Sequence, residues 1–139
     1  LTNIQFIFNV IDKKSLALRL VTSLSKRKHS ILIFCENSEF SANLSRDLWL
    51  NEISFTPNSE EIYSSFDRIF LTTHQADLMD DVLVNCSSKQ IEGFSRYLKF
   101  YELVSSEEQD KNQARKRYQF YRDCGFRIHA TDESELVNL

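Results

Sequence analysis

The sequence predicts one α/β domain in which helices cover both faces of a mostly parallel, mixed β-sheet. Strands and helices alternate through the first half of the chain, and the first two predicted strands are apolar along nearly their whole length. Uninterrupted apolar runs of this length are typical of strands that are covered on both faces. The 139 residues suffice for one domain with a buried core. We therefore expect a three-layer α/β/α sandwich.

The first half of the chain reads as strand, helix, strand, helix. Residues 3–11 (NIQFIFNVI) form the first apolar run, and residues 13–28 carry apolar side chains at helical spacing. Residues 30–35 (SILIFC) form the second apolar run. Ser38 is the expected N-cap of a helix that continues to Trp49. This alternation favours right-handed crossovers between parallel strands.

The second half contains four further predicted strands. They span residues 66–72, 81–85, 100–104 and 126–130. A short helix is expected over residues 91–98, with Phe94 and Leu98 facing the core. The domain is expected to comprise residues 1–130, followed by an acidic tail, residues 131–139, that we expect to be poorly ordered.

The most basic and aromatic stretch, KNQARKRYQFYRDCGF, covers residues 111–126. Gly125 suits a left-handed C-cap, and Phe126 is expected to fold back over the last helical turn. Ser105 or Ser106 is the expected N-cap. The stretch therefore predicts one helix with a defined end.

The predicted helix carries two stripes of different polarity. Ala114, Tyr121 and Cys124 share the less polar stripe, which is expected to pack on the sheet. The other stripe combines cations with an aromatic ring and faces outward; it consists of Lys111, Arg115, Tyr118 and Arg122. Arg117 lies between the stripes and is expected to snorkel to the surface. The outward stripe suits a carboxylate or phosphate partner, although a merely solvated charged face has the same pattern.

A loop over residues 51–61 contains the chain's single proline, Pro57. Ile53 and Phe55 are apolar residues within this otherwise polar segment, and Trp49 closely precedes it. These side chains either form an exposed patch for a partner protein or tuck under the loop as a small satellite core.

Composition excludes several classes of protein. The net charge of −3 opposes tight binding to a polyanion, except through a local basic patch. The three cysteines are far apart in apolar surroundings, which predicts buried, reduced thiols in a cytoplasmic protein. No metal site is expected, because the histidines are isolated and no CxxC pair is present. No apolar run is long enough to cross a membrane. The chain begins at Leu1, so we expect an initiator Met before it.

Catalysis and cofactor binding are not expected. Phosphate loops need glycines for close backbone approach, but the only glycines are Gly93 and Gly125, and neither follows the first two strands. No GxSxG motif and no cysteine with a nearby histidine is present. The sequence thus predicts a Rossmann-like scaffold without a nucleotide-binding loop, without cofactor and without catalytic residues.

Three segments carry a family resemblance. ARKRYQFYRDCGF, with ILIFCEN and DLWLNEISFTPN in the first half, resembles the chi subunit of bacterial DNA polymerase III, an accessory protein of the clamp-loader complex. The likeness extends from the first strand to about His129. It implies a non-catalytic adapter in DNA replication that bridges the psi subunit to the acidic C-terminal tail of single-stranded DNA-binding protein.

The resemblance implies two partner-binding surfaces. For the psi subunit, the implied positions are Trp49, Ile53, Phe55 and Pro57. For the tail they are Val104, Lys111, Arg115 and Tyr118; Gln119 stands where the family has a basic residue, and Arg122 extends the stripe. We expect the cations to pair with the tail's carboxylates while Val104 and Tyr118 flank a pocket for its last apolar residue. The alternative is direct binding of single-stranded nucleic acid by the same basic face.

Overall fold

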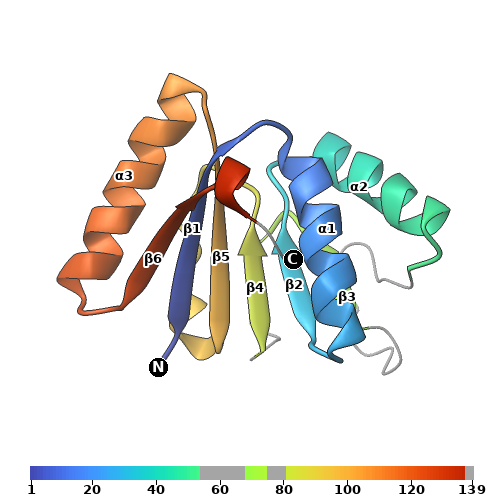
Figure 1. Cartoon of the computed structure of the whole chain (residues 1–139), viewed down its shortest axis with the longest axis horizontal. Helices are drawn as coiled ribbons and strands as arrows, with labels where there is room; N and C mark the ends of the chain where they lie inside the picture. The colour runs from blue at the N-terminus through green and yellow to red at the C-terminus, as the bar shows by residue number, and fades with distance from the viewer. Residues whose placement is uncertain (54–67, 75–80, 137–139) are drawn as a thin grey trace.

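A six-stranded β-sheet forms the centre of the molecule (Figure 1), in a computed structural model that describes residues 1–53, 68–74 and 81–136. The strands are β1 (Asn3–Val10), β2 (Ile31–Phe34), β3 (Ile69–Thr72), β4 (Val82–Asn85), β5 (Lys99–Ser105) and β6 (Ile128–Asp132). Their order across the sheet is β3-β2-β4-β5-β1-β6, and each of the five pairings is parallel. The described sheet is therefore entirely parallel, whereas we had allowed for a mixed one.

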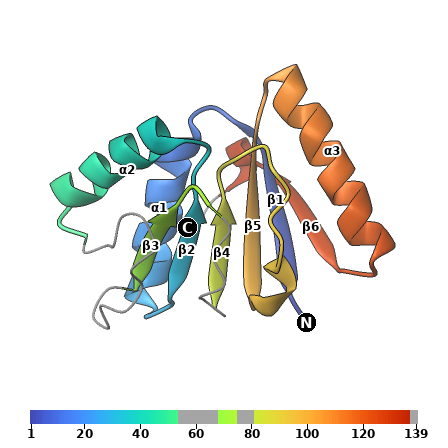
Figure 2. The same ribbon diagram turned by 180° about the vertical axis from the view of Figure 1, so that it is seen from behind.

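Helices pack on both faces of this sheet. The α-helices are α1 (Lys13–Lys26), α2 (Ser38–Leu50) and α3 (Glu108–Asp123), and the short 3₁₀ helices are η2 (Phe94–Arg96) and η3 (Glu133–Glu135). Figures 1 and 2 show α1 and α2 over the β2–β3 end of the sheet and α3 beside β6. Two separate core clusters result, one under α1 and α2 and one under α3 and η2. The predicted α/β/α sandwich is confirmed.

The α-helices that the structure describes all begin at the same edge of the sheet, because the parallel strands before them end there (Figure 1). Asp12 caps α1 by accepting from the backbone N–H groups of Lys14 and Ser15. Asn37 caps α2 through the N–H of Phe40, so the predicted cap at Ser38 is wrong by one residue. Helix α3 starts after Glu107 without a side-chain cap, contrary to the predicted serine cap.

The end of α3 follows the sequence prediction closely. Gly125 has φ +86°, and its N–H donates to the carbonyl of Arg122 while the N–H of Phe126 donates to that of Tyr121. These two bonds form a Schellman motif, in which a left-handed residue satisfies carbonyls at the helix end. Phe126 then packs on Phe94, with ring centroids 5.1 Å apart. The predicted C-cap and the returning Phe126 are confirmed.

Two other predictions about the second half were wrong. The helix expected over residues 91–98 is only the short η2, and Leu98 is 62% exposed rather than facing the core. The poorly ordered tail does not begin at Thr131, because β6 continues to Asp132 and η3 follows. Asn9 Nδ2 donates to Asp132 Oδ2 at 2.8 Å, and the N–H of Ile11 donates to Glu133 at 3.1 Å. These contacts with β1 and the residue after it hold Asp132 and Glu133, which we had assigned to the tail.

The cysteines differ in environment. Cys35 and Cys86 are buried as predicted, and burial raises the pKa of the Cys35 thiol to about 12. Cys124 is exposed at the end of α3, so its predicted burial is wrong. Among the helices that the structure describes, none is long and apolar enough to cross a membrane.

Candidate functional site

A hollow between α3 and the strands β1, β5 and β6 collects most of the predicted tail-binding residues. Its volume is about 600 Å³. The lining includes five of the six positions named from the sequence: Val104, Lys111, Arg115, Tyr118 and Gln119. We call this hollow the basic groove. It arises because the end of β5 and the first turns of α3 lie side by side, although the chain reverses direction between them.

Apolar side chains form the inner part of the basic groove. Val104 is 3% exposed at the end of β5, and the ring of Tyr118 packs edge-on against Phe6 with centroids 5.3 Å apart. Phe8 also lines the groove and remains 37% exposed. An aromatic or aliphatic side chain of a ligand would thus find apolar contacts inside the groove.

A β-bulge in β1 shapes this part of the groove. The register of β1 against β5 shifts between Ile7 and Val10, and Asn9 adopts φ 56°. Asparagine tolerates this left-handed conformation better than most residues. Asn9 lines the groove and bonds Asp132, which ties the bulge to the end of β6.

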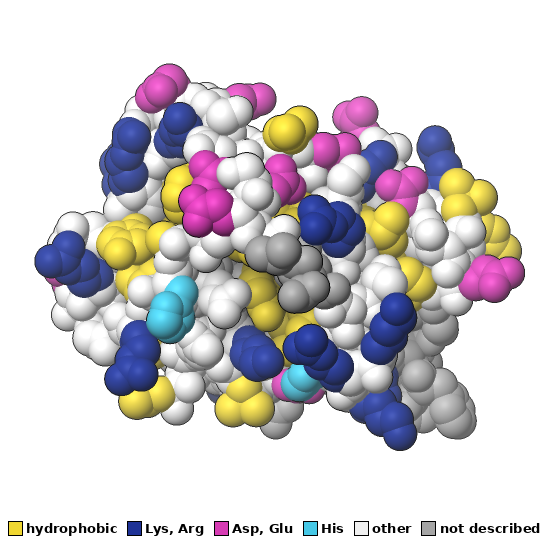
Figure 3. Space-filling model, in the orientation of Figure 1, with side chains coloured by type: hydrophobic (Ala, Val, Ile, Leu, Met, Phe, Trp, Pro, Cys, Tyr) yellow, Lys and Arg dark blue, Asp and Glu magenta, His cyan; other side chains and the backbone are white. Residues whose placement is uncertain are grey.

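Cationic side chains form the outer wall. Lys111 is half-buried, and Arg115 is exposed, with one N–H donated to Asn112 Oδ1 at 2.9 Å. Gln119 Nε2 donates to Asp123 one helical turn further on, at 2.8 Å. Figure 3 shows Lys and Arg side chains over α3, with hydrophobic side chains between them and the rest of this face. Charge and apolar surface therefore lie side by side.

Arg122 differs from the other predicted tail-binding residues. It is exposed on α3 but does not line the basic groove. The helical stripe that we used to select it continues beyond the hollow, because β5 and the bulge in β1 border only the first turns of α3. Arg115 and Arg122 therefore form a natural pair for comparison.

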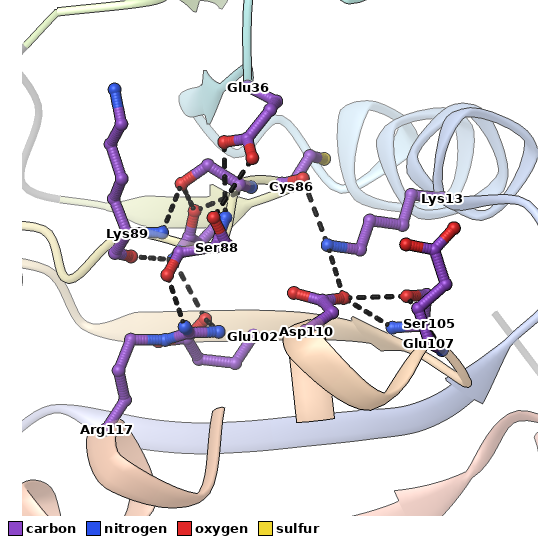
Figure 4. Close-up of polar contacts among 12 residues, drawn as sticks. Lys13, Glu36, Cys86, Ser88, Lys89, Glu102, Ser105, Glu107, Asp110 and Arg117 are labelled. Atoms are coloured by element: carbon purple, nitrogen blue, oxygen red, sulfur yellow. Dashed lines mark hydrogen bonds and ion pairs between the residues drawn. The ribbon is translucent and has the colours of Figure 1, made fainter. Parts of the chain in front are cut away.

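A buried polar network under α3 was missed at the sequence level (Figure 4). Arg117 is 3% exposed and donates to Glu102 from Nε at 3.0 Å and from Nη2 at 3.2 Å. Tyr121 donates its hydroxyl to the same carboxylate at 2.7 Å, and Asn85 Nδ2 donates at 2.9 Å. A third Arg117 nitrogen donates to the carbonyl of Ser88 at 2.8 Å. Arg117 thus links α3 to β5 and to the residues after β4.

Our expectation that Arg117 snorkels to the surface was wrong for an identifiable reason. Ala114, Arg117 and Tyr121 follow the i, i+3, i+7 spacing of one helical face, and all three are buried. Glu102 lies in the apolar strand β5, where a lone carboxylate requires a partner. Those two signals, taken together, would have suggested the pair.

Burial dominates the ionisation of this network. It raises the pKa of Glu102, although Arg117 and the hydrogen bonds from Tyr121 and Asn85 oppose the shift. The pKa of Tyr121 is raised strongly, first by burial and then by the neighbouring Glu102 carboxylate. The tyrosine therefore remains a hydrogen-bond donor at all physiological pH values.

The predicted psi-binding residues are only partly within the described structure. Trp49 is 77% exposed at the end of α2, and the adjacent Leu50 is 70% exposed. Ile53 is half-buried and packs against the core cluster under α1 and α2. Phe55 and Pro57 lie outside the described residues. Trp49 thus fits an exposed patch, whereas Ile53 fits the satellite core that we considered as its alternative.

No metal centre is formed by the residues described: among residues 1–53, 68–74 and 81–136, no group of three His, Cys, Asp or Glu side chains is placed to hold an ion.

The fold is that of a Rossmann-like α/β protein, with a partly basic hollow between α3 and the sheet. The chain belongs to the DNA polymerase III chi subunit family, HolC, whose model matches residues 1–129. The family is one of accessory subunits of DNA polymerase III, which agrees with the resemblance seen in the sequence. A comparison with curated protein sequences finds no match.

Two of the solved structures with a similar fold are the C-terminal domain of Dbp5 and T4 UvsW. The C-terminal domain of the DEAD-box protein Dbp5 shares 12% identity, with a TM-score of 0.66, over 96% of this chain and 91% of that chain. T4 UvsW shares 11% identity, with a TM-score of 0.68, over 99% of this chain and 41% of that chain. Identities this low show a common fold and nothing further.

Proposed function

We propose that this chain is a non-catalytic adapter of the replicative DNA polymerase III in the cytoplasm. In this proposal it bridges the clamp loader, through the psi subunit, to the acidic C-terminal tail of single-stranded DNA-binding protein. The basic groove is the tail-binding site. The observation that carries the proposal is that five residues selected from the sequence line one hollow.

The two kinds of surface in the groove match the two parts of such a tail. Lys111 and Arg115 pair with acidic side chains or the terminal carboxylate, and Arg115 is able to do so with two parallel hydrogen bonds. The terminal apolar side chain packs on Val104 and Tyr118. Because Arg115 is exposed, its ion pairs are modest and sensitive to salt. We expect dissociation constants of about 1 to 10 μM.

The proposal is tested by titrating a labelled peptide of the cell's own single-stranded DNA-binding protein tail. Arg115→Glu should weaken binding by at least about tenfold, because it reverses a charge beside the ligand. The matched variant Arg122→Glu reverses the same charge on the same helix outside the groove, and should weaken binding by less than about twofold. Equal losses in the two variants would indicate only general attraction to the basic helix.

Two further measurements separate this function from direct nucleic-acid binding. Removing the last apolar residue of the peptide should abolish binding to the wild-type chain. A single-stranded oligonucleotide of matched charge should bind more weakly than the intact peptide and should not depend on Val104. An oligonucleotide that binds more tightly than the peptide would overturn the adapter function in favour of direct nucleic-acid binding.

The psi-binding surface in this proposal is centred on Trp49 of α2. Trp49→Ala should weaken binding to the psi subunit while leaving the tail peptide's affinity unchanged. Helix α2 lies near the β3 end of the sheet, whereas α3, which lines the basic groove, lies beside β6 at the other end (Figure 1). Phe120→Ala is a suitable control, because Phe120 is a partly exposed aromatic residue of α3 that does not line the groove.

A further inference from the structure

A second hollow, of about 540 Å³, lies at the edge of the sheet where the parallel strands end. Residues that follow β1, β2, β4 and β5 line it, together with the first turns of α1, α2 and α3. We call it the acidic hollow. In open α/β sheets, ligands bind at this edge, in the crevice where connections leave toward opposite faces. The position therefore suits a binding site, although the chain lacks a phosphate loop.

The acidic hollow has a strong excess of negative charge. Among the described residues that line it there is a single Lys or Arg, Lys13, and there are five carboxylates: Asp12, Glu36, Glu39, Glu107 and Asp110. Lys13 is already engaged, with Nζ 2.8 Å from Asp110 Oδ2 and a bond to the carbonyl of Cys86 at 3.3 Å. Figure 3 shows Asp and Glu side chains along the upper edge of the molecule, above the ends of the strands. The uncompensated charge favours a cation.

Anionic ligands are opposed by the same geometry. The Asp12 carboxylate accepts from the N–H groups of Lys14 at 3.0 Å and Ser15 at 3.4 Å, so it occupies the first turn of α1 where a phosphate would bind. Asn37 accepts from Phe40 at 2.8 Å and occupies the first turn of α2 in the same way. The first turns of α1 and α2 are therefore not free to bind the phosphates that such an edge accepts in nucleotide-binding folds.

One buried side-chain oxygen in the lining lacks a hydrogen-bond partner. The Asp110 side chain is only 9% exposed, and its Oδ1 is buried without a partner. The other oxygen, Oδ2, accepts from Lys13 and from the N–H and hydroxyl of Ser105, whereas Oδ1 points away from Ser105 (Figure 4). A buried acceptor without a donor costs free energy. A hydrogen-bond donor that entered the hollow would remove that cost.

Apolar surface adjoins the carboxylates. Ile11 lines the hollow and is 93% exposed, and Phe40 lines it from α2 and is half-buried. An isoleucine with this exposure gains free energy when an apolar group covers it. Glu39 and Glu107 are exposed on the rim and free to approach a guanidinium.

We propose that the acidic hollow binds a basic segment of a protein partner, with an Arg or Lys side chain directed toward Asp110 and a neighbouring apolar side chain packed on Ile11. The Arg or Lys supplies the donors that Asp110 Oδ1 lacks and offsets the charge of Glu39 and Glu107. This site is independent of the basic groove and requires a ligand of opposite charge.

The test uses NMR amide shifts of the full chain during titration with the peptide acetyl-Leu-Arg-Leu-Arg-amide. We expect the amide signals of Ile11, Asn37 and Ser88 to shift, while those of Ala114 and Tyr118, which line the basic groove, stay in place. The control peptide acetyl-Leu-Glu-Leu-Glu-amide should leave the first group unchanged. Shifts confined to other surfaces, or equal responses to the two peptides, would overturn the proposal.

A matched pair of double variants identifies the carboxylates involved. The double variant Glu39→Lys, Glu107→Lys should bind the basic peptide at least about fivefold more weakly, because two ion pairs are removed and each contributes modestly. Glu92→Lys with Glu108→Lys makes the same change of net charge at exposed residues outside the hollow, and should weaken it by less than about twofold. Equal losses of peptide affinity in the two double variants would show attraction to the whole acidic chain. Identical amide shifts with Mg²⁺ alone would show a simple cation site. Either result contradicts the proposal.

Discussion

The basic groove and the acidic hollow share two elements but carry opposite charge. Val104 lines the groove, and the next residue of β5, Ser105, lines the hollow. Lys111 lines the groove, and the preceding residue of α3, Asp110, lines the hollow. Successive residues of a strand point to opposite faces, and successive helical residues are turned by about 100°. Two surfaces of opposite charge therefore fit around a single strand–helix junction.

This comparison shows why net charge is a poor guide to partners in this chain. A net charge of −3 predicts weak attraction for any acidic ligand, yet Lys111 and Arg115 both line the groove that we propose as the site for one. Interactions between exposed charges are screened over about 8 Å at physiological salt, so a ligand responds mainly to the side chains nearest to it. The charged side chains nearest to a ligand, and not the net charge of the chain, therefore decide whether a surface favours an acidic or a basic ligand.

The largest effect is expected when α3 is released from the sheet, because both surfaces depend on its position. Arg117→Met leaves the Glu102 carboxylate buried without its cation, which should lower the free energy of unfolding by about 3 to 5 kcal/mol. Urea denaturation measures the change. Arg122→Met removes an exposed arginine of the same helix and should change stability by less than about 0.5 kcal/mol. Similar losses in both variants would show that the buried pair has no special role.

The stability that Asp110 of the acidic hollow contributes to the folded protein should depend on pH. Burial raises the pKa of this carboxyl, but the hydrogen bond and charge of Lys13 and the bonds from Ser105 outweigh burial, so the net pKa is lowered below 3.8. A carboxyl with a lowered pKa in the folded state contributes stability above its unfolded pKa, and that contribution is lost as the pH falls further.

Asp110→Asn should therefore lower the free energy of unfolding by about 1 to 2 kcal/mol at pH 7, because a charged hydrogen bond is lost. The difference from the wild type should become progressively smaller below about pH 4. Denaturation curves at several pH values measure the difference. Asp123→Asn, at an exposed position of the same helix, should show no such convergence with the wild type. A cost for Asp110→Asn that persists undiminished at pH 2 would mean that ionisation is not involved.

The apolar side of the groove can be tested separately from its charge. Tyr118→Ala removes a ring that packs on Phe6. It should weaken binding of the tail peptide by about tenfold, because an aromatic contact at a binding site contributes about this much. The basic peptide in the acidic hollow should bind as before. Phe120→Ala serves as the reference, and an equal loss there would assign the effect to general destabilisation of α3.

The smallest expected effect is a gain in affinity for the tail peptide. Gln119→Lys adds a cation to the groove and should raise the affinity for the tail peptide about two- to fivefold, which is the contribution expected of an exposed ion pair. High salt should remove this gain, because it screens exposed charges. Fluorescence anisotropy at two salt concentrations measures it. Gln113→Lys adds the same charge at an exposed position outside the groove. If both substitutions tighten binding equally, Gln119 is not part of the site.

Much of the groove was predictable because it depends on local spacing. The stripe formed by Lys111, Arg115 and Tyr118 follows from helical periodicity, and the Schellman motif at Gly125 follows from the conformational freedom of glycine. Arg122 obeys the same periodicity but lies outside the groove, because periodicity gives a direction around the helix axis and does not show how far the neighbouring strands extend. Cys124 was assigned to the packed stripe for the same reason, although the sheet does not cover it.

The sequence by itself determined the alternation of strands and helices, the two-faced burial of the sheet and the polarity of α3, because each depends on residues near one another in the chain. Only the tertiary structure decided that Glu102 pairs with Arg117, that the bulge at Asn9 borders the groove, and that five carboxylates meet at the carboxyl edge. Those residues come from separate strands and helices. Their proximity depends on strand order, which the crossover connections set and which local sequence patterns do not encode.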